Sequence, residues 1–102
     1  MAANAATAHE FNQPRLAFFY SAVSGRCRRV EGFLAQVLQR RGNHETFRVY
    51  RVPVEERPDL HERLRIERLP TLAVIEGKIV VSRLEQPRAC RQIERFLAPW
   101  MK

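Results

Sequence analysis

LAFFYSAVSGRCRRVEGFLAQVL, residues 16–38, is the stretch that decides the fold of this chain. It opens with a short apolar and aromatic run, residues 16–20, of the kind that forms a buried strand. After a polar turn, apolar residues recur at the i, i+3, i+4, i+7 and i+8 spacing of one helix face, namely Val30, Phe33, Leu34, Val37 and Leu38. The stretch therefore predicts a strand that passes through a short loop into a helix.

The loop Ser24-Gly25-Arg26-Cys27 is expected at the start of that helix. A helix N-terminus leaves amide groups unpaired and carries the positive end of the helix dipole, and both favour negative charge. A thiolate on Cys27 or a bound anion would be stabilised there. We therefore expect any chemistry of this protein at this loop.

The size and composition predict one folded domain. At 102 residues with 45% hydrophobic side chains, the chain can build one core and has no room for a second. Residues 1–14 read as a flexible leader and residues 15–102 as the domain. No apolar run approaches the length that crosses a bilayer, and residues 1–13 lack the basic start and apolar stretch of a signal peptide. We therefore expect a cytoplasmic protein with no membrane partner.

Basic residues outnumber acidic ones, since 18 Lys and Arg against 11 Asp and Glu give a net charge of +7. Such an excess favours an acidic partner, an anionic substrate or loose attraction to nucleic acid. The alternative is compositional, an arginine-rich proteome from a GC-rich genome, and the scattered placement of the charges favours it. A nucleic-acid partner is not expected, because the aromatic residues fall at core spacing and offer no stacking platform.

Neither the cysteines nor the histidines have the spacing of a metal site. Cys27 and Cys90 lie too far apart for a CxxC pair or a ligand cluster. His9, His44 and His61 fall in segments that read as tail, loop and helix surface, where we expect them to be solvated. We expect no metal and no cofactor.

The rest of the chain continues the strand and helix patterns. The first helix is expected to end near residues 40–42 with two arginines in its last turn, and a strand over 47–52 to lie parallel to the first strand. The remaining expected elements are a helix over 58–65 with Leu60 and Leu64 facing inward, strands over 72–75 and 78–84 joined by a turn at Glu76-Gly77, and a helix from Pro87 whose inner face carries Cys90, Ile93, Phe96 and Leu97.

This order, β-α-β-α-β-β-α, resembles the thioredoxin fold over about residues 15–98. The turn at residues 23–27 stands where thioredoxins have Trp-Cys-Gly-Pro-Cys, and Leu69-Pro70-Thr71 matches an Ile-Pro-Thr whose proline is cis in the family. The turn at residues 76–78 matches the hairpin of the family's last two strands. The extra leading strand and helix of full-length thioredoxins are not expected here. The resemblance implies an α/β fold, a four-stranded mixed sheet with helices on both faces.

The departures from the family pattern bear on function. Ser24 stands at the position of the nucleophilic cysteine, where its hydroxyl is too weakly acidic to act as the nucleophile without a base and, having no sulfur, cannot form the mixed disulfide. Cys27 matches the second, resolving cysteine, Phe18 the family's buried Asp, and Arg26 the proline of the motif. The resemblance therefore implies that the full dithiol cycle does not run here.

Three interpretations of Cys27 stay open. It can be an unreactive core residue under the first helix turn. It can be a monothiol nucleophile whose thiolate is stabilised by the helix N-terminus and by Arg26, Arg28 and Arg29. In the third interpretation, Ser24 donates a hydrogen bond to the thiolate of a bound low-molecular-weight thiol.

A partner-binding groove beside the cis proline does not need a catalytic cysteine. Our leading hypothesis is a redox-degenerate protein that binds a protein or peptide, preferably an acidic one, through this groove. The alternative is a monothiol thiol-disulfide oxidoreductase that uses Cys27, assisted by Ser24, with an external thiol. The residues expected to form the groove and its cationic rim are Gly25, Arg26, Arg68, Leu69, Pro70 and Thr71.

Two further expectations concern the last helix and the C-terminus. Cys90 is expected in the core, and no disulfide with Cys27 is expected, because the resemblance places the two helices on opposite faces of the sheet. Trp100 and Met101 are expected to cap the core.

Overall fold

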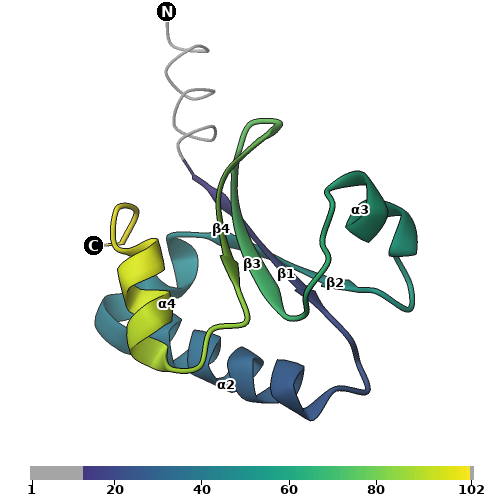
Figure 1. Cartoon of the computed structure of the whole chain (residues 1–102). Coiled ribbons are helices and arrows are strands. Elements are labelled where there is room, and N and C mark those ends of the chain that lie inside the picture. The colour runs from purple at the N-terminus through teal and green to yellow at the C-terminus, as the bar shows by residue number, and fades with distance from the viewer. Residues whose placement is uncertain (1–12, 102) are drawn as a thin grey trace, which may run out of the picture.

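The computed structural model describes residues 13–101, apart from the side chains of Arg41 and His44. Four strands, three α-helices and one short 3-10 helix follow one another in the predicted order (Figure 1). They are β1 (Arg15–Tyr20), α2 (Gly25–Gln39), η1 (Arg40–Glu45), β2 (Arg48–Pro53), α3 (Pro58–Arg63), β3 (Thr71–Glu76), β4 (Ile79–Glu85) and α4 (Cys90–Leu97). Most of the leader expected over residues 1–14 lies outside the described residues.

The four strands form one mixed sheet in the order β2-β1-β3-β4. β1 runs parallel to β2 and antiparallel to β3, and β3 runs antiparallel to β4. The α/β fold class and the four-stranded mixed sheet are therefore confirmed. The register places Phe19 opposite both Val52 and Thr71, so the last residues of β1 lie beside the first residues of β3 at one end of the strands.

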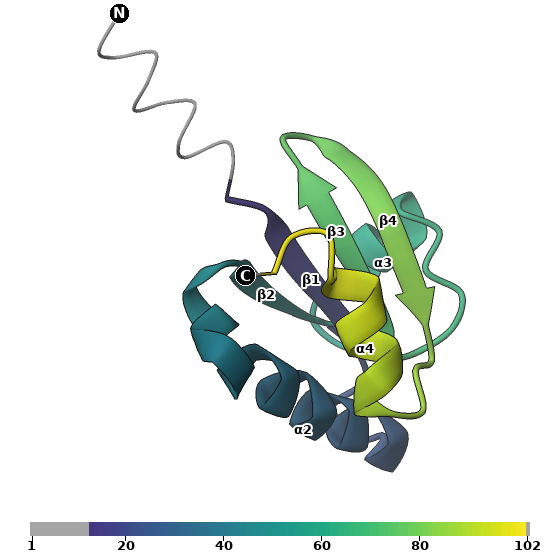
Figure 2. The same cartoon turned by 90° about the vertical axis from the view of Figure 1, so that its left-hand side faces the viewer.

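Alternation along β1 divides the core between the two faces of the sheet. Leu16 and Phe18 belong to the larger cluster under α2 and α4, whereas Ala17 and Phe19 belong to the smaller cluster under α3. Figures 1 and 2 show the same layering, with α2 and α4 on one side of the sheet and α3 on the other. The expectation of helices on both faces is confirmed.

The expected arrangement of the first and last long helices is wrong. α2 and α4 lie on the same face of the sheet, because Ile93 and Leu97 of α4 join the core cluster that α2 also covers. Cys90 contacts the middle of α2, with its Sγ 3.3 Å from Gln36 Oε1, while Cys27 lies at the start of α2. Both cysteines are free.

Three helix ends differ from the sequence expectations. α2 ends at Gln39, so the two arginines after it belong to η1 rather than to a last α-helical turn. α3 ends at Arg63, two residues earlier than expected, and α4 begins at Cys90 rather than Pro87. Arg65 after α3 is left-handed (φ 55°) and breaks the helical path there, and Ala89 before α4 has extended backbone (φ −155°, ψ 156°), so that helix starts only at the next residue.

His61 is the clearest error of the sequence analysis. It was expected on a solvated surface, but only 4% of it is exposed. Its ring meets Phe19 edge-on at 5.2 Å, and its Nε2 lies 2.8 Å from the Val52 carbonyl oxygen. α3 has only six residues, and it packs His61 inward together with Leu60 and Leu64, which confirms the inward placement of the two leucines. His9 and the side chain of His44 lie outside the described residues.

The C-terminus closes over the larger core cluster. Trp100 and Met101 are half-buried against it, as expected for a cap, and the Trp100 indole N–H donates to Glu76 Oε1 at 2.7 Å. Among the described residues, no helix is long and apolar enough to span a bilayer.

Candidate functional site

The loop between β1 and α2 is held by its own serine. Ser24 is the N-cap of α2, with extended backbone (φ −95°, ψ 123°). Its Oγ accepts a hydrogen bond of 3.2 Å from the Cys27 N–H, which satisfies one of the free donors of the first helical turn. The hydroxyl oxygen therefore points back into the helix start.

Cys27 is enclosed beneath this cap. Its exposed fraction is 1%, and its Sγ accepts a hydrogen bond of 3.4 Å from the Ser21 N–H. The rings of Phe18 and Tyr20 stack with their centroids 4.9 Å apart. Together with Cys27 they line a cavity of about 60 Å³. This volume is about that of two water molecules, so no substrate reaches the sulfur without movement of the loop.

Glu55 is a site residue that the sequence analysis missed. It follows β2, and its carboxylate accepts hydrogen bonds from the Ser21 hydroxyl and from the Ala22 N–H. These two bonds hold the pKa of Glu55 below its ordinary value, and the bond from the Ser21 hydroxyl contributes most. The predicted topology could have found it: because β1 and β2 are parallel, both end on the same side of the sheet, and the residues that follow them must be neighbours.

The Leu69–Pro70 loop forms the other side of the site. The peptide bond between these residues is cis. Gln86 fixes the loop through its backbone N–H to the Pro70 carbonyl (2.8 Å) and its side-chain amide to the Leu69 carbonyl (3.2 Å). The Thr71 hydroxyl donates to the Arg68 carbonyl at 2.6 Å. The loop therefore has little conformational freedom left to lose when a partner binds.

The predicted site residues divide into an exposed rim and a buried base. The β1–β3 register brings the two loops to one end of the sheet. Gly25, Arg26 and Arg68 are exposed and Leu69 is half-buried, whereas Pro70 and Thr71 are buried and can only support the loop. Neither Arg26 nor Arg68 takes part in an ion pair within the described chain. The predicted residues therefore give the rim two positive charges beside the exposed carboxylate of Glu55, and Val23, 87% exposed, adds an apolar group to it.

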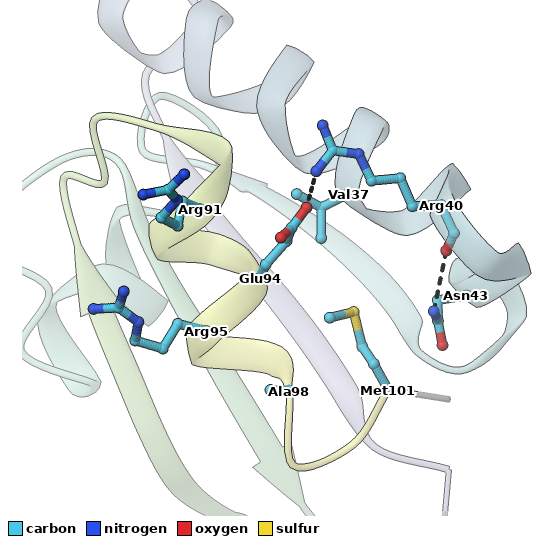
Figure 3. A pocket seen from close by; sticks show the side chains of 8 residues that line it. All are labelled: Val37, Arg40, Asn43, Arg91, Glu94, Arg95, Ala98 and Met101. Carbon is cyan, nitrogen blue, oxygen red and sulfur yellow. Dashed lines mark hydrogen bonds and ion pairs between the residues drawn. The ribbon is translucent and has the colours of Figure 1, made fainter.

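A larger cavity lies at the opposite end of α2, between η1 and α4 (Figure 3). Its volume is about 650 Å³, and Glu94 reaches across it from α4 to form an ion pair with Arg40. A 15-residue helix is about 22 Å long, so this cavity is separate from the Ser24 and Pro70 loops. It is lined by Val37, Arg40, Asn43, Arg91, Glu94, Arg95, Ala98 and Met101.

Comparison with protein-family models places this arrangement in a known group. The model described as Thioredoxin matches residues 4–99. The chain belongs to the thioredoxin family. No curated protein matches this thioredoxin-family chain significantly.

Solved thioredoxins resemble this family member in fold and little in sequence. Trxlp from Edwardsiella tarda superposes with a TM-score of 0.74 at 20% identity, covering 92% of each chain. Mitochondrial thioredoxin 3 from Saccharomyces cerevisiae gives 0.72 at 15% identity over 94% of this chain and 89% of the yeast one. Deadhead from Drosophila melanogaster gives 0.75 at 13% identity, over 95% of this chain and 90% of its own.

Within the thioredoxin fold, the structure gives a position to each residue that departs from the expected family pattern. Ser24 caps the helix, and Phe18, at the position of the family's buried Asp, is 1% exposed in the larger core cluster. The cavity at Cys27 is lined by Phe18, Tyr20, Ser21, Ala22, Ser24, Arg28 and Glu31. Among the described residues, no three His, Cys, Asp or Glu side chains gather as metal ligands would.

Proposed function

We propose that this thioredoxin-family protein binds an extended acidic segment of a partner protein in the groove beside Pro70 and does not catalyse dithiol exchange. The observation that carries the proposal is the enclosure of Cys27, 1% exposed beneath a serine cap. A thiol that no disulfide can approach cannot attack one to form a mixed disulfide. The loss of thiol access leaves the recognition surface around it intact.

Charge and preorganisation support recognition at this groove. Arg26 and Arg68 offer guanidinium groups that form no ion pair with the described residues, and an acidic segment would supply carboxylates for them. Gln86 and Thr71 hold the Arg68–Pro70 backbone in place before binding. A partner strand would therefore meet a rigid wall with a cationic rim.

One observation favours the monothiol alternative. The Ser21 N–H donates to Cys27 Sγ at the start of a helix whose first turn holds no acidic residue. A hydrogen-bond donor at the sulfur and a helix start without carboxylates are both found at reactive cysteine sites. An oxidoreductase of this kind would require the loop at residues 21–24 to open before each reaction.

Alkylation separates the two functions. Native Cys90→Ala protein is treated with iodoacetamide, and modification of Cys27 is followed by mass spectrometry. We expect protection of Cys27 until the protein unfolds. Rapid alkylation of the folded protein would support the monothiol enzyme and contradict the enclosure of Cys27 on which the proposal rests.

A gain-of-function variant tests the assignment of Ser24. In the presence of dithiothreitol, wild-type protein is expected to reduce insulin disulfides no faster than dithiothreitol alone does. Ser24→Cys restores a pair with Cys27 and is expected to accelerate the reduction. Equal rates for wild type and variant would show that the loss of activity lies elsewhere than at residue 24.

Binding itself is measured by titrating ¹⁵N-labelled protein with reduced, carboxymethylated insulin A chain, an unfolded acidic probe. Chemical-shift changes are expected at Gly25, Leu69 and Thr71. Arg26→Gln combined with Arg68→Gln should weaken binding, while the control Arg63→Gln, exposed on α3, should not. Shifts confined to other surfaces would refute binding at this groove.

A further inference from the structure

The outer edge of β2 is exposed along most of its length. β2 is a terminal strand of the sheet, and residues 48–51 are all exposed, with Val49 at 38% and Tyr50 at 41%. The N–H groups of Arg48 and Val54 donate inward, to the carbonyls of Pro14 and Tyr20 on the β1 side. Because backbone groups alternate along a strand, those of Val49 and Arg51 point outward. In the described part of the chain, no strand pairs with this edge.

The two sides of this edge differ in chemistry. On the α2 side lies a hollow of about 500 Å³, whose floor is mainly apolar, with Leu34, Leu38 and Val49 among its lining residues. The Arg51–Glu31 ion pair, at 3.2 Å, lies on the same side. On the α3 side, Arg15 lies over the ring of Tyr50 at 6.0 Å, and the register places Arg48 beside Arg15.

These observations define what could pair with β2. A strand added to the edge would send alternate side chains to opposite faces, one set into the hollow and the other toward Arg15 and Arg48. The first set must be apolar and the second acidic. A second copy of β2 does not fit, because its sequence, RVYRVP, holds two arginines and no acid, so paired copies would place four arginines on adjacent strands.

We infer that the β2 edge binds an extended segment of a partner protein in which apolar and acidic residues alternate. Main-chain hydrogen bonds to Val49 and Arg51 hold the segment, the hollow accepts its apolar side chains, and the exposed guanidinium groups of Arg15 and Arg48 select its acidic ones. This surface is distinct from the Pro70 groove and does not depend on the function proposed there.

The test uses two synthetic peptides and ¹⁵N-labelled full-length protein. The peptide acetyl-GELEVELEG-amide is expected to shift the amides of Val49 and Arg51 and to bind about tenfold more tightly than acetyl-GKLKVKLKG-amide. Because the selecting charges are exposed, added salt should reduce the difference. No shift at these amides with about 1 mM acidic peptide would overturn the inference.

Two variants block the edge in different ways. Val49→Pro removes an outward N–H and leaves the hydrogen bonds to β1 in place, and Ala35→Glu puts a charge into the hollow from an exposed position on α2. Each variant is expected to bind the acidic peptide about tenfold more weakly than the wild type does. The control Gln92→Glu adds the same charge on α4, outside the hollow, and should bind as the wild type does.

Other outcomes identify other occupants and count against the inference. Shifts only at residues 24–26 and 68–71 would place the peptide in the Pro70 groove, which would support the proposed function and refute this one. Dimerisation of the free protein that Val49→Pro abolishes would assign the edge to a second copy. If Val49→Pro does not fold, unchanged binding by Ala35→Glu overturns the proposed seating of the apolar side chains.

Discussion

Replacing Ser24 with alanine tests whether its hydroxyl belongs to the helix or to a ligand. The substitution removes the 3.2 Å hydrogen bond from the Cys27 N–H and leaves that donor without a partner at the start of α2. Loss of an N-cap of this type costs about 1 kcal/mol of the free energy of unfolding, within a range of about 0.5–2 kcal/mol. For a domain of this size, 1 kcal/mol lowers the melting temperature by about 4–8 °C.

The measurement is urea denaturation followed by circular dichroism, with Ser24→Asp as the matched variant. Aspartate also accepts from the Cys27 N–H and adds a negative charge that suits the helix dipole, so Ser24→Asp should be at least as stable as the wild type. A loss below about 0.3 kcal/mol in Ser24→Ala, less than any ordinary cap contributes, would refute the capping role. The hydroxyl would then be free for a bound thiol, as in the third interpretation of Cys27.

Four further substitutions test other parts of the structure. Glu55 has a lowered pKa in the folded protein, so its contribution to stability is present above the unfolded pKa of 4.5 and is lost as pH falls through the folded pKa. Glu55→Gln should therefore reduce the loss of unfolding free energy on acidification. An unchanged pH dependence of the unfolding free energy would contradict the hydrogen bond with Ser21. Phe18→Ala should cost about 3–5 kcal/mol by denaturant titration, because the ring is 1% exposed, and a cost below about 1 kcal/mol would contradict its core position. Gly77→Ala should destabilise the protein by about 1 kcal/mol, because residue 77 has φ +64°. Gly32→Ala, in open space on α2, should instead stabilise the protein by about 0.5–1 kcal/mol. A stabilising effect of Gly77→Ala would refute the left-handed turn.

The order of elements could be predicted because each long element has a strong local pattern. The strand at residues 16–20 and the helix after it carry uninterrupted signals, and the structure places them where the sequence did, within a few residues. The face on which α4 packs has no such signal. It is decided by which core cluster Ile93 and Leu97 can join, a property of the assembled sheet rather than of the residues near α4.

The candidate site could be placed in the fold from the sequence, but the exposure of its residues could not. The motif placed Ser24 and Cys27 at the start of a helix, yet whether the thiol faces solvent depends on Tyr20, on the Ser21 N–H and on the loop above them. Glu55 escaped notice because its role requires that the ends of two parallel strands meet. His61 was misplaced because a helix of six residues is too short for periodicity to show which side is buried.

The hydrogen bond between Trp100 and Glu76 gives the chain an optical reporter. Trp100 is the only tryptophan, and it is bonded at the end of β3, five residues and about 17 Å from Thr71 at the start of that strand. Its fluorescence therefore senses the far end of β3 and not the groove itself. A ligand beside Pro70 that merely occupies the groove will leave the emission unchanged, so a spectral shift on binding would measure a disturbance carried along the strand to the C-terminal cap.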